Sequence, residues 1–443
     1  MAYWEQVRVD PDYAGASRRE RQGGTYRRYH PDRLVGSDTS VSGPVLEHVV
    51  DVTGALQRFG ARLRANPFPV LYSTALRSES ISSSWIEGVR ATPRDVAFAE
   101  LSSDDPAVDA GGTTAHVASQ VARNVRAMQD AVDLLGAGKW EHEQIWDIHH
   151  ELLPWHRRGY RQTQVWIGGV TPLDAEYAGP PHESVRDYMD DLLEYVNTAG
   201  DLPVLAAALV HAQFESIHPF SDGNGRVGRA LVHGVLKRAG LVEGGILPLS
   251  SALRNDAPGY VAALTAYRYD GTTPAARTAA LDDYVSRFLA YIGDAVASAN
   301  HFVDAALALD ARWRESVSGA RTDGAIHRAL DVVIEQPVLT TRFLAGRLRV
   351  TSRRAEDLVG QLVSIGVLNP GSGKYRRSAV YQSNDILTLL EFGAEAGPAT
   401  PAPVLAAGRQ VHLVHRCGEP TAKGSCANRV PEPGMKCWRH RAS

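Results

Sequence analysis

The spacing of apolar residues along the chain predicts a mainly helical protein. From Val45 onward, apolar residues recur three and four positions apart, so that Leu56, Phe59 and Leu63 fall on one face of a helix. Helical patterns continue to about residue 312. Residues 165–181 interrupt them, because Val165-Trp166-Ile167 followed by pairs of glycine and proline indicates a short strand or hairpin.

The same pattern divides the chain into segments that differ in composition. The start is polar and rich in arginine with little periodicity, and a later stretch of Ala, Pro and Gly is typical of a linker. We predict an N-terminal region at 1–110, a helical core at 111–312, a separate module at 322–393, a linker at 394–408 and a small tail at 409–443.

Composition narrows the functional classes. The 443 residues are 44% hydrophobic and 22% charged, which is enough apolar material for a large core. The net charge of −3 gives no overall basic field, so any affinity for nucleic acid must come from a local patch. The sequence has no apolar run of membrane-spanning length and no apolar leader, so we expect a cytoplasmic protein without a membrane partner.

One stretch, residues 218–229, contains several residue types that are common in catalytic and ligand-binding sites. It reads His-Pro-Phe-Ser-Asp-Gly-Asn-Gly-Arg-Val-Gly-Arg and lies between two segments with apolar helical spacing. Pro219 ends the first predicted helix, and Gly223-Asn224-Gly225 begins the second. The stretch is therefore expected to form a tight loop between two apolar helices.

Such a loop is suited to a polyphosphate. Glycines let backbone N–H groups approach an anion, and a helix N-terminus adds partial positive charge. Arg226 and Arg229 lie three residues apart and can grip different phosphate oxygens. Asp222 could hold Mg²⁺ against those phosphates, and His218 has a side chain suited to taking a proton from a hydroxyl.

Gly223, Gly225 and Gly228 also match the glycine spacing of a dinucleotide-binding fold. That fingerprint needs a strand immediately upstream, whereas the segment before His218 has helical spacing. We therefore reject a dinucleotide site. A glycine-rich turn with a surface histidine is the structural alternative, but it does not explain why so many phosphate-binding residue types occur together.

With these residues in place, the sequence resembles the Fic (Fic/Doc) family, whose signature is H-x-F-x-[D/E]-G-N-G-R-x-x-R. Every fixed position matches, with Phe220 as the aromatic residue. The resemblance implies a helical core with a β-hairpin flap, and AMP transfer from ATP to a Ser, Thr or Tyr hydroxyl of a protein. It assigns His218 as general base and Asp222 as Mg²⁺ ligand. The implied ATP-binding residues are Gly223, Asn224, Gly225, Arg226, Val227, Gly228, Arg229 and Tyr260.

A second match lies far upstream. Residues 83–88 read Ser-Ser-Trp-Ile-Glu-Gly and fit the family's inhibitory pattern [S/T]-x-x-x-E-[G/N]. The resemblance then implies an N-terminal inhibitory helix with Ser83, Glu87 and Gly88 as its marked positions. A glutamate beside Arg229 would form a charge-assisted pair and keep that arginine from the γ-phosphate. The structural alternative is that Glu87 is a carboxylate at a helix end exposed to water.

Two further family features bear on the substrates. Residues 159–181 are similar to the family's flap, which would pair with an extended protein segment through backbone hydrogen bonds. Relatives often carry two adjacent tyrosines near the nucleoside, whereas this chain has Tyr260-Val261, which leaves the preferred nucleobase open.

Residues 322–393 resemble a winged helix-turn-helix. Thr340 could cap a second helix ending at Leu348, and Thr351 or Ser352 a third. Between residues 342 and 377, eight Lys and Arg stand against two Asp and Glu, which is a net charge of +6. This patch could bind the phosphates of DNA, although a packing module with a solvated basic face remains the alternative.

The tail contains all three cysteines of the chain, Cys417, Cys426 and Cys437, followed by His440. Three thiolates and one imidazole can complete a tetrahedral Zn²⁺ site, and the metal would then supply the folding energy that so short a segment lacks. Unpaired thiols in a disordered end are the alternative.

The leading hypothesis is an autoinhibited protein adenylyltransferase that uses ATP and Mg²⁺ and modifies a protein, itself included. The alternatives are a DNA-binding regulator whose Fic region senses nucleotide, and a Fic enzyme that removes AMP or transfers another phosphate-linked group. The sequence leaves the oligomeric state open, with a homodimer among the alternatives.

Overall fold

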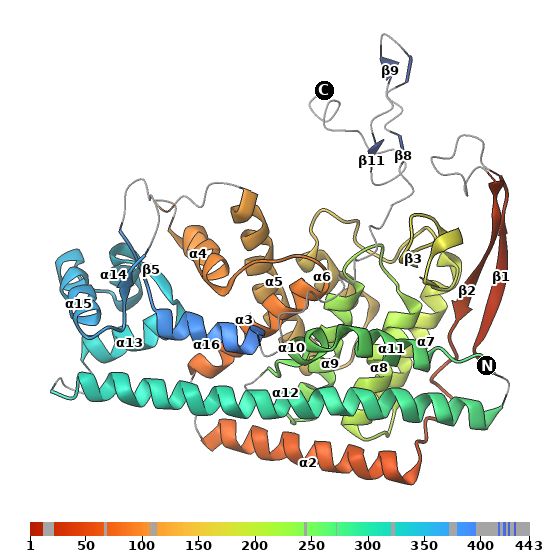
Figure 1. Ribbon diagram of the computed structural model, residues 1–443, viewed down its shortest axis with the longest axis horizontal. Coiled ribbons are helices and arrows are strands. Elements are labelled where there is room, and N and C mark those ends of the chain that lie inside the picture. The colour runs from red at the N-terminus through yellow and green to blue at the C-terminus, as the bar shows by residue number, and fades with distance from the viewer. Residues whose placement is uncertain are drawn as a thin grey trace.

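The computed structural model describes most of the chain outside the C-terminal tail. The described residues are 1–11, 22–65, 69–105, 108, 113–242, 246–271, 273–319, 324–371 and 379–395, with the pairs 415–416, 420–421, 424–425 and 429–430. Helices dominate these ranges, as the periodicity predicted (Figure 1). None of the described helices combines the length and the apolar character needed to cross a membrane.

The helical core comes from the first two thirds of the chain. Its helices are α2 (Gly43–Ala65), α3 (Pro69–Ile86), α4 (Pro93–Asp104), α5 (Thr113–Gly136), α6 (His142–Leu152), α7 (Val185–Thr198), α8 (Pro203–Ile217), α9 (Asn224–Arg238), α10 (Leu249–Asn255), α11 (Ala257–Tyr267) and α12 (Pro274–Ser316). The central helix is α8, because its residues from Val204 to Ile217 are all buried and it packs against α7, α9, α11 and α12. Helices α2 and α12 lie side by side along one edge (Figure 1).

The N-terminal residues form a hairpin that the sequence analysis missed. Strands β1 (Tyr3–Val9) and β2 (Gly24–His30) pair antiparallel, with Glu5 opposite Arg28. Those two side chains form an ion pair in which Arg28 Nε lies 2.6 Å from Glu5 Oε2. The strands carry polar side chains that bind across the hairpin, so no apolar alternation revealed them.

The hairpin predicted at residues 165–181, inside the flap segment 159–181, is present. Strands β3 (Trp166–Ile167) and β4 (Tyr177–Ala178) pair antiparallel, with the short helix η1 (Pro172–Asp174) between them and η2 (His182–Ser184) before α7. Strand β2 packs against β4, and Ala2, Tyr29 and Tyr177 form a small buried cluster. The N-terminal hairpin therefore supports the flap.

Residues 325–395 form a C-terminal module at one end of the molecule (Figure 1). Its elements are α13 (Ala325–Glu335), β5 (Val338–Thr340), α14 (Thr341–Leu348), α15 (Ser352–Ser364), β6 (Asn369–Pro370), β7 (Val380–Gln382) and α16 (Asn384–Glu395). The strands form an antiparallel sheet in the order β5-β7-β6. Thr340 caps α14 and Thr351 caps α15, as predicted. Residues 372–378 lie outside the described ranges.

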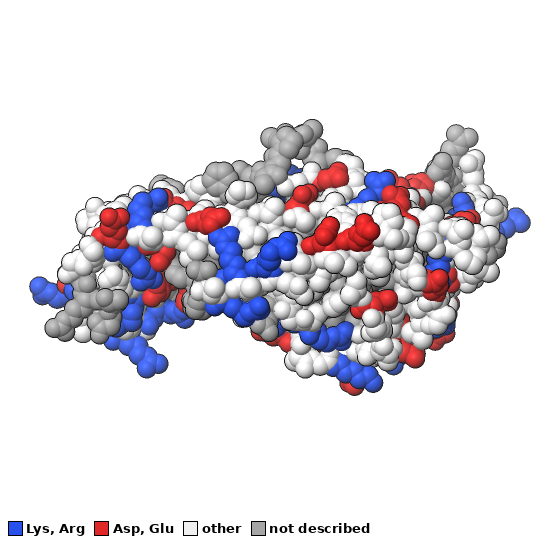
Figure 2. Space-filling model, turned by 90° about the horizontal axis from the view of Figure 1, so that it is seen from below, with Lys and Arg blue, Asp and Glu red and all other residues white. Residues whose placement is uncertain are grey.

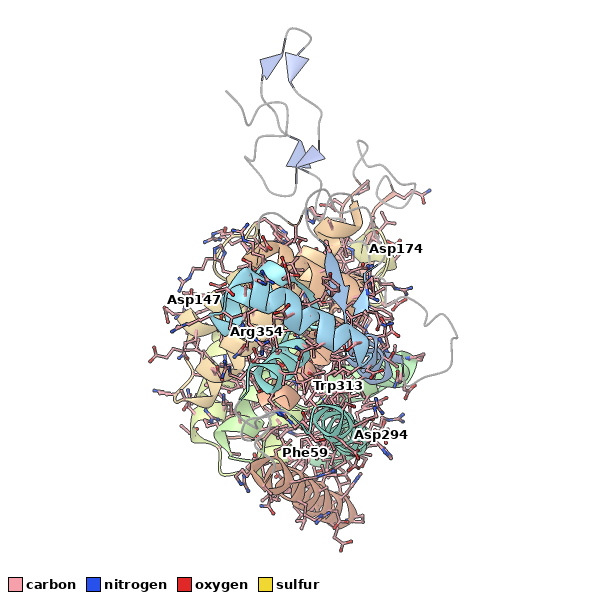
Figure 3. The ribbon with its side chains drawn as sticks, turned by 90° about the vertical axis from the view of Figure 1, so that its left-hand side faces the viewer. Phe59, Asp147, Asp174, Asp294, Trp313 and Arg354 are labelled. Carbon is pink, nitrogen blue, oxygen red and sulfur yellow. The ribbon has the colours of Figure 1, made fainter. Side chains whose placement is uncertain are left out.

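The C-terminal module shares its apolar core with α4 and α12. Its apolar cluster includes Ala97 and Leu101 of α4 and Leu309 and Trp313 of α12. Trp313 is labelled in Figure 3, which looks onto this end of the molecule. Since α12 extends to Ser316 and contributes to that cluster, the predicted boundary near residue 312 falls inside a continuous helix.

The tail is described only in four short strands. These are β8 (His415–Arg416), β9 (Pro420–Thr421), β10 (Gly424–Ser425) and β11 (Arg429–Val430), with β8 paired to β11 and β9 to β10. Cys417, Cys426, Cys437 and His440 lie outside the described residues. Within the described residues there is no group of three or more His, Cys, Asp or Glu arranged to hold a metal.

Candidate active site

The loop between α8 and α9 has the shape that its sequence predicted. Helix α8 ends at Ile217, and His218 caps it in the left-handed region, with φ 51° and its N–H donating to Phe214 O at 2.9 Å. Gly223 also has a positive φ, 81°, and α9 begins at the next residue. Few residues other than glycine adopt this conformation, so a left-handed histidine at the site marks a backbone fixed by its surroundings.

Asn224 braces this loop. Its side chain accepts from Phe220 N at 2.9 Å and donates to Phe220 O at 2.8 Å. The Phe220 ring stacks on His149 with 3.8 Å between ring centroids, and His149 Nε2 contacts Asp222 O at 3.0 Å. Burial lowers the pKa of His149 to about 4, so this imidazole is neutral near pH 7. The side-chain amide of Asn224 therefore fixes the loop backbone.

His218 is buried and held by an arginine that the motif does not contain. Burial, with smaller contributions from Arg161 and Arg268, lowers the pKa of His218 to about 3. The imidazole is therefore neutral near pH 7, which is the form a general base needs. Arg161 donates to His218 O at 2.8 Å and to Pro180 O at 2.6 Å, and so ties the loop to the end of the flap.

Arg229 points at the end of α3. Its side chain is 1% exposed and donates to Ser83 Oγ at 2.9 Å, to Ser83 O at 3.0 Å and to Glu87 Oε1 at 2.9 Å. Helix α3 ends at Ile86, and Gly88 follows with φ 79°, so the turn presents the Glu87 carboxylate to α9. Ser83 and Glu87 of the upstream pattern thus contact the second arginine of the motif, and Gly88 forms the turn that follows them.

Arg226 has a different neighbour. Its guanidinium lies 3.6 Å from Asp222 Oδ1 and is buried, whereas the Asp222 side chain is 36% exposed. Asp222 Oδ1 also accepts from Gly223 N at 2.6 Å, which orients the carboxylate. The two arginines of the motif are therefore used differently, because Arg226 lies against the aspartate while Arg229 reaches α3.

A cavity of about 160 Å³ joins these groups. It is lined by residues of the loop, the flap, the end of α3 and one face of α11, among them Glu87, Tyr177, His218, Asp222, Gly225, Arg229 and Tyr260. Tyr260 is buried, and its hydroxyl lies 2.9 Å from His211 Nε2. Small-molecule sites commonly measure about 300–1,000 Å³. The cavity is therefore small for a triphosphate nucleotide while Glu87 stands in it.

Comparisons with known proteins match two segments of the chain to one family. A profile described as "Fic/DOC family" matches residues 139–236, and a second, "Fic/DOC family N-terminal", matches residues 46–133. These two segments of the chain are therefore similar to the Fic/DOC family. The first Fic profile spans the loop from His218 to Arg229, and the second spans Glu87, so both sides of the Arg229 contact lie in matched regions.

Curated relatives of the Fic region are named adenylyltransferases. The chain is 31% identical over 105 residues to "Protein adenylyltransferase fic-1" of Caenorhabditis elegans, covering 22% of this chain and 19% of that protein. It is 29% identical over 171 residues to "Probable protein adenylyltransferase aq_aa38" of Aquifex aeolicus, covering 38% and 49%. The matches thus span about half or less of these relatives.

Solved structures of Fic proteins are similar as well. A Fic family protein from Desulfovibrio desulfuricans G20 matches with 20% identity and a TM-score of 0.46, over 78% of this chain and 98% of that one. Fic-1 of C. elegans, residues 134–508, matches with 20% identity and a TM-score of 0.41, over 60% and 73%.

The Fic region also contains a buried acid that sequence reasoning overlooked. Glu215 lines the cavity, and its Oε2 lies 3.9 Å from His218 Nδ1. Burial raises the pKa of Glu215 to about 7. The available signal was that Glu215 is the single carboxylate among residues 203–217. No comparable signal marked Arg161, because its position depends on carbonyl groups from three separate segments.

Proposed function

We propose that the chain is a protein adenylyltransferase that moves AMP from ATP to a Ser, Thr or Tyr hydroxyl of a protein, itself included. One observation carries the proposal: His218, Asp222, Gly225 and Arg229 line a single cavity at the N-terminus of α9. The names of the curated relatives support the same activity.

The reaction joins one oxygen to one phosphorus. The hydroxyl oxygen of the target attacks the α-phosphorus of ATP, the bond to the bridging oxygen breaks, and diphosphate leaves. His218 takes the hydroxyl proton, and its neutral form is the one that can accept it. Much of the rate would come from holding the hydroxyl and the α-phosphate in line, as in other phosphoryl-type transfers.

The cavity wall suits the phosphates and their metal. Asp222 offers a half-exposed carboxylate, and Mg²⁺ prefers one or two carboxylates completed by phosphate oxygens and water. Mg²⁺ bound there would neutralise phosphate charge. The N–H groups of residues 223–225 open α9 and form an anion site of the kind found at helix N-termini. Arg229 is the cation placed for the outer phosphate.

We infer that Glu87 holds this site in an inhibited state. Its carboxylate occupies the guanidinium that the γ-phosphate would need, and Ser83 binds the same arginine from α3. The C-terminal end of α3 adds partial negative charge beside Arg229. While this contact persists, ATP lacks its outer phosphate ligand and binds in an unproductive pose.

The flap supports the docking of a protein target. Strands β3 and β4 are two residues each and border the cavity through Trp166, Ile167 and Tyr177. An extended segment of a target can add to such a short sheet through main-chain hydrogen bonds. That arrangement would bring its hydroxyl toward His218 and would tolerate more than one side chain beside it.

A second candidate function is a DNA-binding regulator, and the C-terminal module favours it. The order of its helices and strands suits a winged helix-turn-helix. Arg349, Arg353 and Arg354 are exposed at the turn and the start of α15, and none forms an ion pair with a described residue. Lys and Arg gather at this end of the molecule (Figure 2). Exposed arginines on such a helix can meet DNA phosphates.

The position of the label in ATP separates the chemical alternatives. Wild type, His218→Ala and Glu87→Gly are incubated in lysate with ATP labelled at either the α- or the γ-phosphate. Adenylyl transfer predicts protein labelling from the α-position only, strongest in Glu87→Gly and lost in His218→Ala. Labelling from the γ-position would show phosphate transfer instead, and release of AMP from prelabelled protein would show removal.

A further inference from the structure

Helix α3, which presents Glu87, has an unusual buried face. Seven of its residues are polar and at most 3% exposed: Thr74, Ser78, Glu79, Ser80, Ser82, Ser83 and Ser84. Glu79 accepts from Ser250 N at 2.8 Å and contacts His233 Nε2 at 3.1 Å. Leaving such a buried polar group unpaired costs about 1–3 kcal/mol, so the contacts of this face favour one position of α3.

The C-terminal module packs directly on this helix and on its continuation. Helices α13 and α16 lie against α3, and β5 and α16 lie against α4. Helix α4 begins only a few residues after Glu87, and Leu389 of α16 contacts both the main apolar core and the module's cluster. Helices α3 and α4 therefore link the module to the catalytic loop, beside a second connection through α12.

Hydrogen bonds fix α4 to the module along its length. Arg94 Nε donates to Gln382 Oε1 at 2.7 Å near the start of the helix. Gln336 Nε2 donates to Ala97 O at 2.6 Å in its middle, and Thr340 Oγ1 donates to the Asp105 carboxylate at 3.1 Å just beyond its end. With Ala97 and Leu101 in the shared apolar cluster, α4 follows the position of the module.

We propose that the C-terminal module is the regulatory input of this protein, which keeps Glu87 on Arg229 by holding α3 and α4 in place. A ligand that displaces the module would loosen both helices and release Arg229 for the γ-phosphate. The proposal rests on the inhibitory role of Glu87, but the position of α3 can be followed without any catalytic reaction.

The test compares two Gln→Ala substitutions, of which one should change the exchange of α3 and the other should not. Gln336→Ala removes the bond to Ala97 O of α4 and a second bond to Val338 O within the module, whereas Gln361→Ala changes an exposed side chain on α15. Amide hydrogen exchange of residues 76–88 is measured without nucleotide, and label transfer from α-labelled ATP is measured separately. Loss of the bond to α4 should increase the fraction of molecules in which residues 76–88 are open to exchange about fivefold, and only in Gln336→Ala.

A double substitution decides whether the effect runs through Glu87. Gln336→Ala should raise the rate of AMP transfer when it is made in the wild-type protein. It should not raise the rate further in the Glu87→Gly variant, which already lacks the inhibitory carboxylate. The proposal is overturned if α13 and β5 exchange faster in Gln336→Ala while residues 76–88 do not. If Gln336→Ala fails to fold, Gln382→Ala, which removes the contact with Arg94, takes its place. Absence of transfer in Glu87→Gly would instead reject adenylyl transfer, and the exchange data would still decide the coupling.

Discussion

Replacing Glu87 by glycine should turn the enzyme on. The substitution removes the carboxylate that Arg229 binds at 2.9 Å, in a pair whose side chains are 17% and 1% exposed. Hydrogen bonds to charged groups contribute about 1.5–3 kcal/mol. At 1.4 kcal/mol for each factor of ten, freeing Arg229 should raise the transfer rate at subsaturating ATP about 10- to 100-fold.

Neutral variants refine the prediction. Glu87→Gln keeps the shape and one hydrogen bond but loses the charge, and should give a smaller rise than Glu87→Gly. Glu176→Gln makes the same chemical change on the flap side of the cavity, where no contact with Arg229 exists among the described residues, and should leave the rate near that of wild type.

The assay follows incorporation of α-labelled AMP into the protein at several ATP concentrations. We expect each variant to fold, because Arg229 can still bind Ser83 after the change. Thermal unfolding of each variant checks this expectation. A folded Glu87→Gly protein that binds ATP yet labels no faster than wild type would refute the argument that Arg229 is the blocked phosphate ligand.

Three further predictions follow from the structure and the sequence. Burial lowers the pKa of His149, His211 and His218 from 6.5 to between about 3 and 4, so these side chains take up protons on unfolding. The free energy of unfolding should therefore fall as the pH drops from about 6.5 to 4. Urea titrations at several pH values measure this free energy, and a value that does not change with pH would contradict the prediction. The protein should bind a DNA duplex with an affinity that falls steeply as salt rises, and this salt dependence should be smaller in the double variant Arg353→Ala/Arg354→Ala. Gel shifts that give the double variant the same affinity as wild type would argue against α15 as the DNA contact. The tail should carry one equivalent of Zn²⁺ that a chelator removes, and elemental analysis showing less than that would contradict the assignment.

Much of the fold near the site could be predicted because local sequence determines it. Pro219 and the glycines of residues 223–228 fix where one helix ends and the next begins, and the structure places those ends at Ile217 and Asn224. The caps at Thr340 and Thr351 were predictable for the same reason, since a threonine side chain needs only the amide three residues later.

Tertiary contacts explain what the sequence did not reveal. Arg161 acts on His218 from 57 positions away, through backbone carbonyl groups that carry no sequence signature. The N-terminal hairpin is held by Glu5, Arg28 and packing on Tyr177, so its strands lack the alternation that marks a strand. The different neighbours of Arg226 and Arg229 depend on where α3 lies, which a motif spacing cannot determine.

Gly225 links inhibition and catalysis at one backbone position. A Cβ placed there would overlap Oε1 of Glu87 and would come within 2.8 Å of Arg229 Nη1. The missing side chain therefore lets a carboxylate reach the N-terminus of α9, and the same open space lets phosphate oxygens reach its N–H groups. In the proposed inhibited state, Glu87 would therefore stand where a phosphate would bind. Control of the proposed activity would then depend on the position of α3.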